Sequence, residues 1–176
     1  MPSATTALMT FAELERLPDS DTRYELRHGE LIALPPPRHK HFRIQQNLRR
    51  ALEKAAGETG EAGTEFGFRP KPEHEYWVAD VAFISRDRWL VIPDEGNLQG
   101  VPEIVIEVLS PSNTASEMLD REQICLENGA REFWVVDPVR LQVKVSTPDG
   151  HSVTYKSGRE IPLLFGGTLA VNSIFA

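Results

Sequence analysis

The sequence has almost no cysteine, since Cys125 is the single one among its 176 residues. One thiol cannot form an intrachain disulfide, which excludes a disulfide-stapled secreted scaffold and fits a reducing compartment. No apolar run approaches the roughly 20 residues that a membrane helix needs. The first residues, MPSATTALMTF, also lack the basic and apolar regions of a secretory signal. We therefore expect a cytoplasmic protein that does not enter a membrane.

Positive charge is also scarce. The chain has 19 Lys and Arg against 26 Asp and Glu, a net charge of −7 at pH 7. This balance argues against a globally basic nucleic-acid-binding surface, although it leaves room for a local basic face. The 40% hydrophobic and 26% charged residues are typical of a globular protein. Without repeats or linker-like tracts, this length predicts a single domain over residues 1–176.

The hydrophobic pattern predicts a mixed α/β fold. Strands are expected at 24–27, 30–34, 64–69, 77–84, 103–109 and 132–136, and helices at 38–56 and 115–128. Thr10 and Glu13 have the spacing of a capping box that opens a short helix. A hairpin is expected at 141–156 around Pro148-Asp149-Gly150, appended toward the C-terminus. Residues 85–102, rich in Pro and Gly, are expected to form a surface excursion.

Two carboxylates stand where buried strands should be apolar. Asp80 interrupts WVADVAFI, and Glu107 interrupts EIVIEVL. A buried carboxylate needs a partner or a shifted pKa. If the two strands are neighbours, both acids can share a divalent cation, and carboxylate oxygens suit Mg²⁺ or Mn²⁺. The alternative is that each acid is paired with its own arginine or lysine.

A basic residue follows on the next predicted helix. Arg121 lies four residues after Glu117, so the two side chains share one helix face. That face can return the guanidinium to the sheet edge beside the two acids. The alternative is an exposed Glu117–Arg121 ion pair, which the spacing alone favours.

The segment 38–50, RHKHFRIQQNLRR, is locally basic in this acidic chain. It contains Arg38, Lys40, Arg43, Arg49 and Arg50 and no acidic residue. Such a segment can face a phosphate backbone, or it can be a solvated helix face. The segment by itself slightly favours the second interpretation.

These motifs together resemble the Uma family, whose members are described as putative restriction endonucleases of the PD-(D/E)xK nuclease superfamily. The segments that carry the resemblance are YELRHGEL (24–31), RHKHFRIQQNL (38–48), VADVAFI (78–84), PEIVIEVLSPS (102–112) and GAREFWVVDP (129–138). Ala79 stands where the family has proline. The resemblance implies a restriction-endonuclease-like core, with a mixed central sheet flanked by helices and a C-terminal β-hairpin.

The resemblance also implies a catalytic site. Asp80 and Glu107 would bind Mg²⁺ (or Mn²⁺), with Glu25 as a further catalytic acid. The family's lysine corresponds to Arg121, which stays protonated and cannot act as a general base. Water activation would then fall to the metal or to a nearby carboxylate. For Glu25, the alternative is an exposed strand carboxylate paired with Arg23 or Arg27.

The predicted function is a metal-dependent endonuclease that hydrolyses phosphodiester bonds of duplex DNA. Weaker expected contacts to phosphate or DNA come from His41, Arg38, Lys40 and Arg43, and for His41 a structural role is the alternative. By analogy with the superfamily we expect a homodimer, with Trp89 as a candidate interface residue. The competing hypothesis is a catalytically degenerate module that binds DNA or a protein partner without turnover. The feature that favours this competing hypothesis is Arg121, which stands at the position of the family's lysine.

Overall fold

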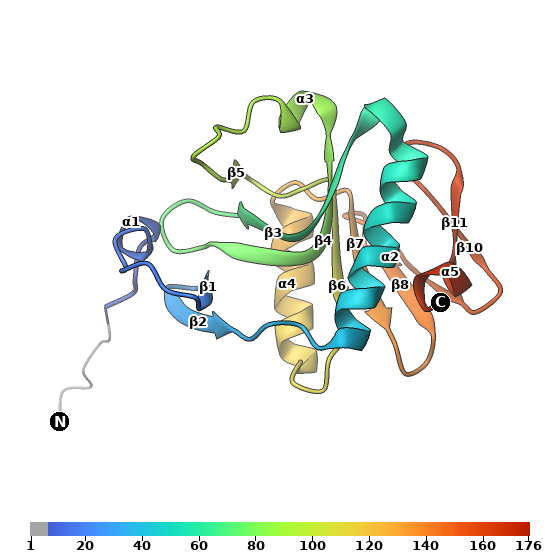
Figure 1. Cartoon of the computed structure of the whole chain (residues 1–176), viewed down its shortest axis with the longest axis horizontal. Coiled ribbons are helices and arrows are strands. Elements are labelled where there is room, and N and C mark those ends of the chain that lie inside the picture. The colour runs from blue at the N-terminus through green and yellow to red at the C-terminus, as the bar shows by residue number, and fades with distance from the viewer. Residues whose placement is uncertain (1–6) are drawn as a thin grey trace.

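The computed structural model describes residues 7–176, and a seven-stranded mixed sheet runs through its centre (Figure 1). The strand order is β5-β3-β4-β6-β7-β8-β9. The strands are β3 (Gly60–Arg69), β4 (Trp77–Ser85), β5 (Leu98–Gln99), β6 (Ile104–Val108), β7 (Glu132–Asp137), β8 (Gln142–Ser146) and β9 (Ser152–Lys156). The β3–β5 and β6–β7 pairs are parallel, and the other pairs are antiparallel.

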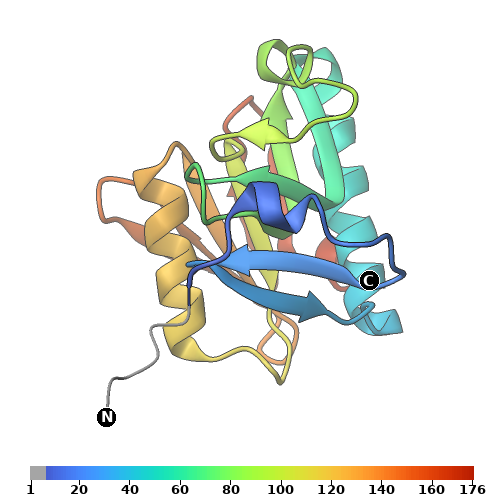
Figure 2. The same cartoon turned by 90° about the vertical axis from the view of Figure 1, so that its left-hand side faces the viewer.

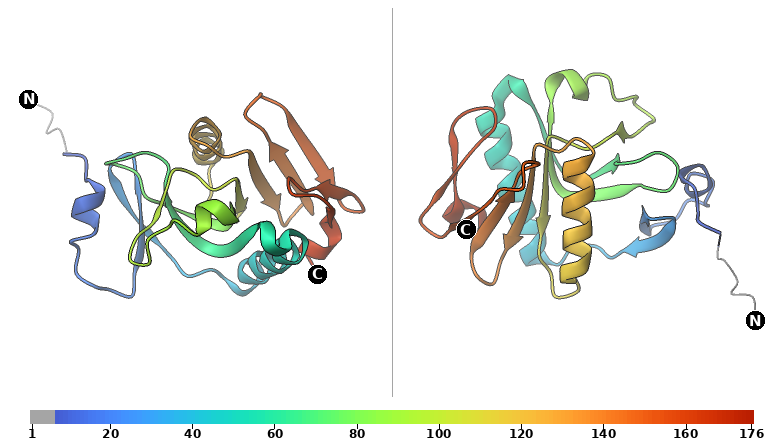
Figure 3. Two further views of the ribbon diagram at one scale, coloured as in Figure 1. Left: turned by 90° about the horizontal axis from the view of Figure 1, so that it is seen from above. Right: turned by 180° about the vertical axis from the view of Figure 1, so that it is seen from behind.

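Two long helices cover opposite faces of this sheet, as the view from above shows (Figure 3). One face carries α2 (His39–Ala56), together with the hairpin β10 (Glu160–Pro162) and β11 (Thr168–Ala170) and the short α5 (Val171–Ile174). Ile44, Leu48 and Leu52 follow the spacing of one helix face and are almost fully buried. Burying each such side chain contributes about 1.5–3 kcal/mol, so this face holds α2 on the sheet.

The opposite face carries α4 (Ala115–Glu127). The Thr114 hydroxyl accepts from the Glu117 N–H, and the Glu117 carboxylate accepts from the Thr114 N–H, so a capping box starts this helix. Ile124 and the free thiol Cys125 then pack on the sheet in a cluster that includes Phe68, Trp77 and Phe133. The helix directly after β6 is thereby fixed across the back of β6 and β7.

A small hairpin of β1 (Arg23–Arg27) and β2 (Glu30–Leu34) lies beside the main sheet (Figure 2). Its turn contains His28 and Gly29, both with positive φ. A bridge between Leu26 and Tyr76 joins the hairpin to the segment that leads into β4. The short helices are α1 (Phe11–Leu14), η1 (Gly57–Thr59) and α3 (Arg86–Trp89).

The predicted fold class is confirmed, and most predicted elements form with shifts of a few residues at their ends. Thr10 and Glu13 form the predicted capping box. The hairpin of residues 141–156 forms as β8 and β9, and its strands also continue the central sheet. A second hairpin, β10–β11, was not predicted. Within residues 7–176, no helix is both long and apolar enough to span a membrane.

Candidate active site

Three carboxylates stand in one row across neighbouring strands. The β3–β4 ladder sets Glu65 opposite Asp80 when its register is followed through that position. The β4–β6 ladder, continued by one residue past its last pair, sets Glu107 on the other side of Asp80. The expectation that the strands of Asp80 and Glu107 are neighbours is confirmed, and the strands are antiparallel.

Strand β4 changes face at Asp80. Ala79 packs in the cluster on the α4 side, whereas Val81 packs in the cluster on the α2 side. Residues two apart in a regular strand face the same way, so the strand is twisted between these two. Opposite this point, Glu65 has a φ of 53°, which non-glycine residues seldom adopt. At this point the Asp80 carboxylate bonds to His41 and Gln45 of α2 and to the Val108 N–H.

Asp80 is held mainly by neutral donors. The Val108 N–H donates to it at 2.7 Å and the Gln45 side-chain amide at 3.0 Å. The His41 Nε2 lies 3.0 Å from the same carboxylate. Within residues 7–176, no arginine or lysine forms an ion pair with Asp80, whose side chain is 19% exposed. This acid is therefore positioned from three sides and remains accessible.

The pKa of His41 is shifted by burial and by the neighbouring acids Asp80 and Glu65. Burial by itself would lower the pKa of the His41 imidazole. The hydrogen bond to Asp80 and the charges of Asp80 and Glu65 outweigh burial, so the pKa of His41 lies above its usual value. The imidazolium form is thus favoured next to the carboxylates.

Glu65 and Gln45 are site residues that the sequence analysis missed. The fully buried Gln45 amide of α2 donates to both Glu65 and Asp80, bridging the two acids. The Arg23 guanidinium pairs with Glu65 at 2.7 Å. The sequence could have pointed to Gln45, because a polar side chain on the apolar face of a helix needs a hydrogen-bond partner. Glu65 had no such signal, since only the strand register places it.

Glu107 lies in a buried charge network around Arg121. The Arg121 Nη2 donates to Glu107 at 2.7 Å and to the Val78 carbonyl at 3.0 Å. Its Nη1 donates to the two oxygens of Glu25 at 3.0 and 3.2 Å. The guanidinium also stacks on the Trp77 ring, 4.9 Å from its centroid. The Arg121 side chain is 4% exposed, so a single cation ties α4 to β1, β4 and β6.

The pKa of Glu107 reflects its burial and its charged neighbours. Burial raises that pKa to about 8; the neighbouring Arg121 opposes the rise, while the charges of Asp80 and Glu25 add to it. Burial alone would lower the pKa of Arg121, but Glu107 and Glu25 raise it above its usual value. Glu25 has a second partner in Arg27, at 2.5 Å. Arg121 therefore stays charged, whereas Glu107 takes up a proton more readily than an ordinary glutamate does.

The structure brings together five predicted site residues: Asp80, Glu107, Arg121, Glu25 and His41. The alternative of an exposed Glu117–Arg121 pair is wrong, because Arg121 is buried and Glu117 caps α4. The alternative of an exposed Glu25 is wrong in its exposure, since that side chain is 1% exposed, although its pairing with Arg27 does form. Glu107 pairs with Arg121, which it shares with Glu25, whereas the ion-pair partner of Asp80 within residues 7–176 is His41.

The basic residues of the segment 38–50 divide into two groups. Arg38, Lys40 and Arg43 are exposed at its start, next to His41. Further along, Arg49 pairs with Glu53 and Arg50 donates to Asn47, so both are satisfied by their own helix. The start of α2 is the part that can meet an anionic partner.

The donor set at Asp80 and Glu107 fits a hydrated hard cation. Within residues 7–176, no group of three or more His, Cys, Asp and Glu side chains is arranged to enclose a metal. Mg²⁺ does not require such a cage, because it keeps several waters and binds through one or two carboxylates. Two carboxylates in register on adjacent strands supply that minimum, and the all-oxygen set favours Mg²⁺ or Mn²⁺.

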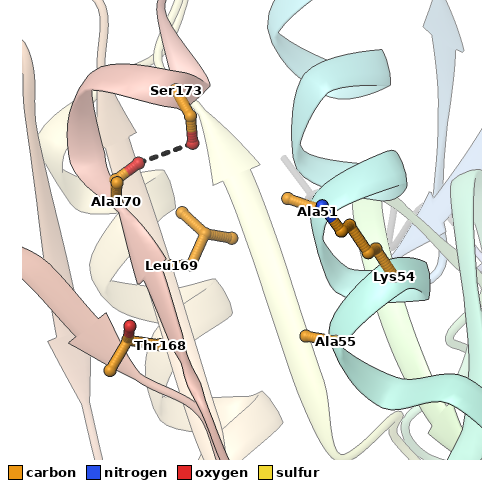
Figure 4. A pocket seen from close by; sticks show the side chains of 7 residues that line it. All are labelled: Ala51, Lys54, Ala55, Thr168, Leu169, Ala170 and Ser173. Carbon is orange, nitrogen blue, oxygen red and sulfur yellow. Dashed lines mark hydrogen bonds between the residues drawn. The ribbon is translucent and has the colours of Figure 1, made fainter.

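A separate hollow lies between α2 and β11 (Figure 4). Small side chains such as Ala51, Ala55 and Ala170 line it, with Lys54 at its edge. The Ser173 hydroxyl there is bound to the carbonyl of Ala170 at 2.7 Å. None of its lining residues is a carboxylate, so this hollow is not a second candidate metal site.

Known proteins resemble this chain along most of its length. The profile of the Uma2 family, described as "Putative restriction endonuclease", matches residues 11–171. A solved structure from Anabaena variabilis, described as a putative nuclease belonging to DUF820, has a TM-score of 0.80 and 21% sequence identity. That similarity covers 95% of this chain and 97% of the other, and it shows a common fold. No curated protein matches the chain at a significant level.

Proposed function

This chain belongs to the Uma2 family of putative restriction endonucleases, and from that premise we propose that it is a Mg²⁺- or Mn²⁺-dependent endonuclease acting on duplex DNA. The family and the solved neighbour both point to a nuclease in general terms. The metal, the duplex substrate and the catalytic roles of single residues are our proposal.

The observation that carries this proposal is the placement of Asp80 beside Glu107. The two acids occupy adjacent positions on neighbouring strands, and the Val108 N–H from the second strand holds the Asp80 carboxylate at 2.7 Å. Burial is the main reason that the pKa of Glu107 is raised, and repulsion by the Asp80 charge adds to the rise. A divalent cation between them would remove that repulsion, which gives the arrangement a physical reason.

Each residue would then have a role set by its contacts. Asp80 and Glu107 would hold the cation, which lowers the pKa of a bound water and neutralises the scissile phosphate. His41 and Gln45 orient Asp80 by hydrogen bonds. Arg121 opposes the burial-driven rise in the pKa of Glu107 and so favours its ionised form. It would also add positive charge behind Glu107, where negative charge develops in the transition state.

Phosphodiester cleavage tests the proposal directly. Asp80→Asn and Glu107→Gln remove one metal-binding charge each while keeping side-chain size, so nicking of supercoiled plasmid DNA should fall at least about 100-fold. Mn²⁺ binding, measured by electron paramagnetic resonance, should weaken in parallel. Asp94→Asn changes an exposed loop acid and serves as the matched control. Undiminished nicking by both site variants would reject the assignment.

One observation favours the competing function, a DNA- or protein-binding module without turnover. The Arg121 guanidinium is buried and engaged with Glu107, Glu25 and the Val78 carbonyl, so little of it is free to meet a phosphate. A module of this kind would bind duplex DNA and show no nicking with either metal. Nicking that appears only in Arg121→Lys would support this second function, and nicking by the unaltered protein would exclude it.

A further inference from the structure

The turn between β7 and β8 presents an apolar and a basic side chain to solvent. Val139 is 85% exposed, more than any other large hydrophobic residue in the described chain. Arg140 follows it with a side chain that is 72% exposed. A valine this exposed contributes little to folding, because it buries almost no apolar area.

This turn is held in a defined shape. One Asp137 oxygen accepts the N–H groups of Val139 at 2.9 Å and Arg140 at 3.0 Å. The other lies 3.1 Å from the Arg140 guanidinium. The Lys40 ammonium donates to the Pro138 carbonyl at 3.4 Å and so links the turn to the start of α2. The tip is therefore presented with little conformational freedom, which lowers the entropy cost of using it in binding.

The turn stands beside the acid row. In the parallel β6–β7 ladder, Val136 is the partner of Val108, and the Val108 N–H binds Asp80. The turn begins two residues after Val136. Figures 1 and 2 place this turn, the start of α2 and the loop before α4 along the same edge of the molecule. A duplex laid across Asp80 along that edge would also pass the tip.

That edge is basic within an acidic protein. The three segments that form it are residues 35–43, 109–116 and 138–141. Together they contain Arg38, Lys40, Arg43 and Arg140 and no Asp or Glu. Asp137, just before the third segment, offsets part of the Arg140 charge. The three segments themselves carry only positive charge in a chain with a net charge of −7, which favours a polyanion.

We propose that the β7–β8 turn enters a groove of the bound duplex, with Arg140 reaching a base edge or inner phosphate and Val139 packing against bases or sugars. This inference rests on the proposed function, because the same duplex must lie across Asp80. A short apolar side chain flanked by a cation is suited to a groove, where apolar contacts and arginine donors read the bases. The tip would then influence where the duplex is cut.

Duplex binding and cut-site mapping test this proposal. In fluorescence anisotropy with a labelled 30-base-pair duplex, Arg140→Gln should weaken binding about tenfold and reduce the slope of log affinity against log salt by about 1. Val139→Ser should change the distribution of cut positions on a long duplex, read by sequencing the ends. Both residues are exposed, so melting temperatures should match the unaltered protein.

Matched controls carry the same chemical changes elsewhere. Arg131→Gln lies before β7, at the opposite end of that strand, and Val153→Ser lies on β9; both residues are exposed. If the tip variants bind and cut as these controls do, the proposal about the turn is overturned while the nuclease assignment stands. If the unaltered protein neither binds nor cuts a duplex, both fail together.

Discussion

At the residue scale, the central feature is one arginine shared by two buried acids. Arg121 bonds to Glu107 and Glu25, and the electrostatic influence of Asp80 reaches Glu107 as well. Desolvating such charges is costly, and an ion pair of this kind roughly breaks even against apolar residues. Removing one partner is different, because it leaves an uncompensated charge in the interior. The network therefore matters more for what it positions than for the stability that it adds.

We expect Arg121→Ala to lower the free energy of unfolding by about 3–5 kcal/mol, because Glu25 and Glu107 would lose their shared cation. Urea denaturation followed by circular dichroism measures this. Arg131→Ala, at an exposed position, should change stability by less than about 0.5 kcal/mol. Equal effects of the two substitutions would contradict the central role of Arg121.

His28 should make stability depend on pH. The His28 imidazole lies 2.7 Å from Asp120 on α4 and 2.9 Å from Glu75. Its pKa is raised mainly by the hydrogen bond to Asp120. Partial burial opposes the rise, and the charge of Glu75 adds to it. A raised pKa in the folded state means that the stabilisation is complete below the unfolded value of about 6.5. It is lost as the pH rises through the folded value.

The measurement compares His28→Asn with the unaltered protein, because asparagine tolerates the positive φ at this position. The difference in urea midpoint should be largest near pH 5.5–6 and should shrink by pH 8.5. The side chain is half exposed, so the difference should stay below about 1 kcal/mol. A difference that grows with pH would show that the sign is wrong.

At the element scale, the long antiparallel pair β3–β4 supports the acid row. It begins at Gly60, where a Cβ would meet the Ile84 carbonyl and the Phe83 ring. Gly60 has an extended backbone, so the requirement there is space rather than an unusual φ. The close approach of the two strands at this end fixes the register that sets Glu65 opposite Asp80.

Gly60→Ala should therefore destabilise the protein by about 1–3 kcal/mol, because a backbone oxygen cannot move aside as a side chain can. Gly63→Ala is the control on the same strand, where the added methyl would make only an ordinary contact with Phe66. It should be neutral or slightly stabilising. The melting temperatures of both variants test this prediction. A Gly60→Ala variant as stable as the unaltered protein would show that a Cβ fits at this position.

At the scale of the whole molecule, an apolar patch stands apart from the basic edge. It consists of Trp89, Leu90 and Val91, the last two 69% and 76% exposed, and the Trp89 ring lies against Phe66. Contiguous exposed apolar side chains mark interaction surfaces more often than isolated ones do. This patch is our candidate for the interface of the predicted homodimer.

If the protein is a homodimer through this patch, Leu90→Asp with Val91→Asp should convert it to a monomer, because charges would be desolvated in the interface. Light scattering coupled to size-exclusion chromatography measures the mass. Val153→Asp changes an exposed valine on β9 and should leave the mass unchanged. A monomeric unaltered protein would refute the dimer, and a dimer that persists in the double variant would refute this interface.

The sequence by itself determined the elements and the principal acids. Periodicity and turn residues are local signals, and they predicted both long helices and the strands that carry Asp80 and Glu107. The two acids could be recognised because a carboxylate inside an apolar strand needs a reason. The resemblance of the motifs then led to the correct fold class.

Only the tertiary structure decided which side chains meet. Glu65 joins the row through strand register, and Arg121 is buried because α4 packs back across β6, against the preference that helix spacing alone suggested. The continuation of the sheet through β8 and β9 likewise depends on pairing with β7. Register, burial and ion-pair partners arise from contacts between residues far apart in the chain. A pattern within one segment carries no information about its partner, so these features could not be read from sequence.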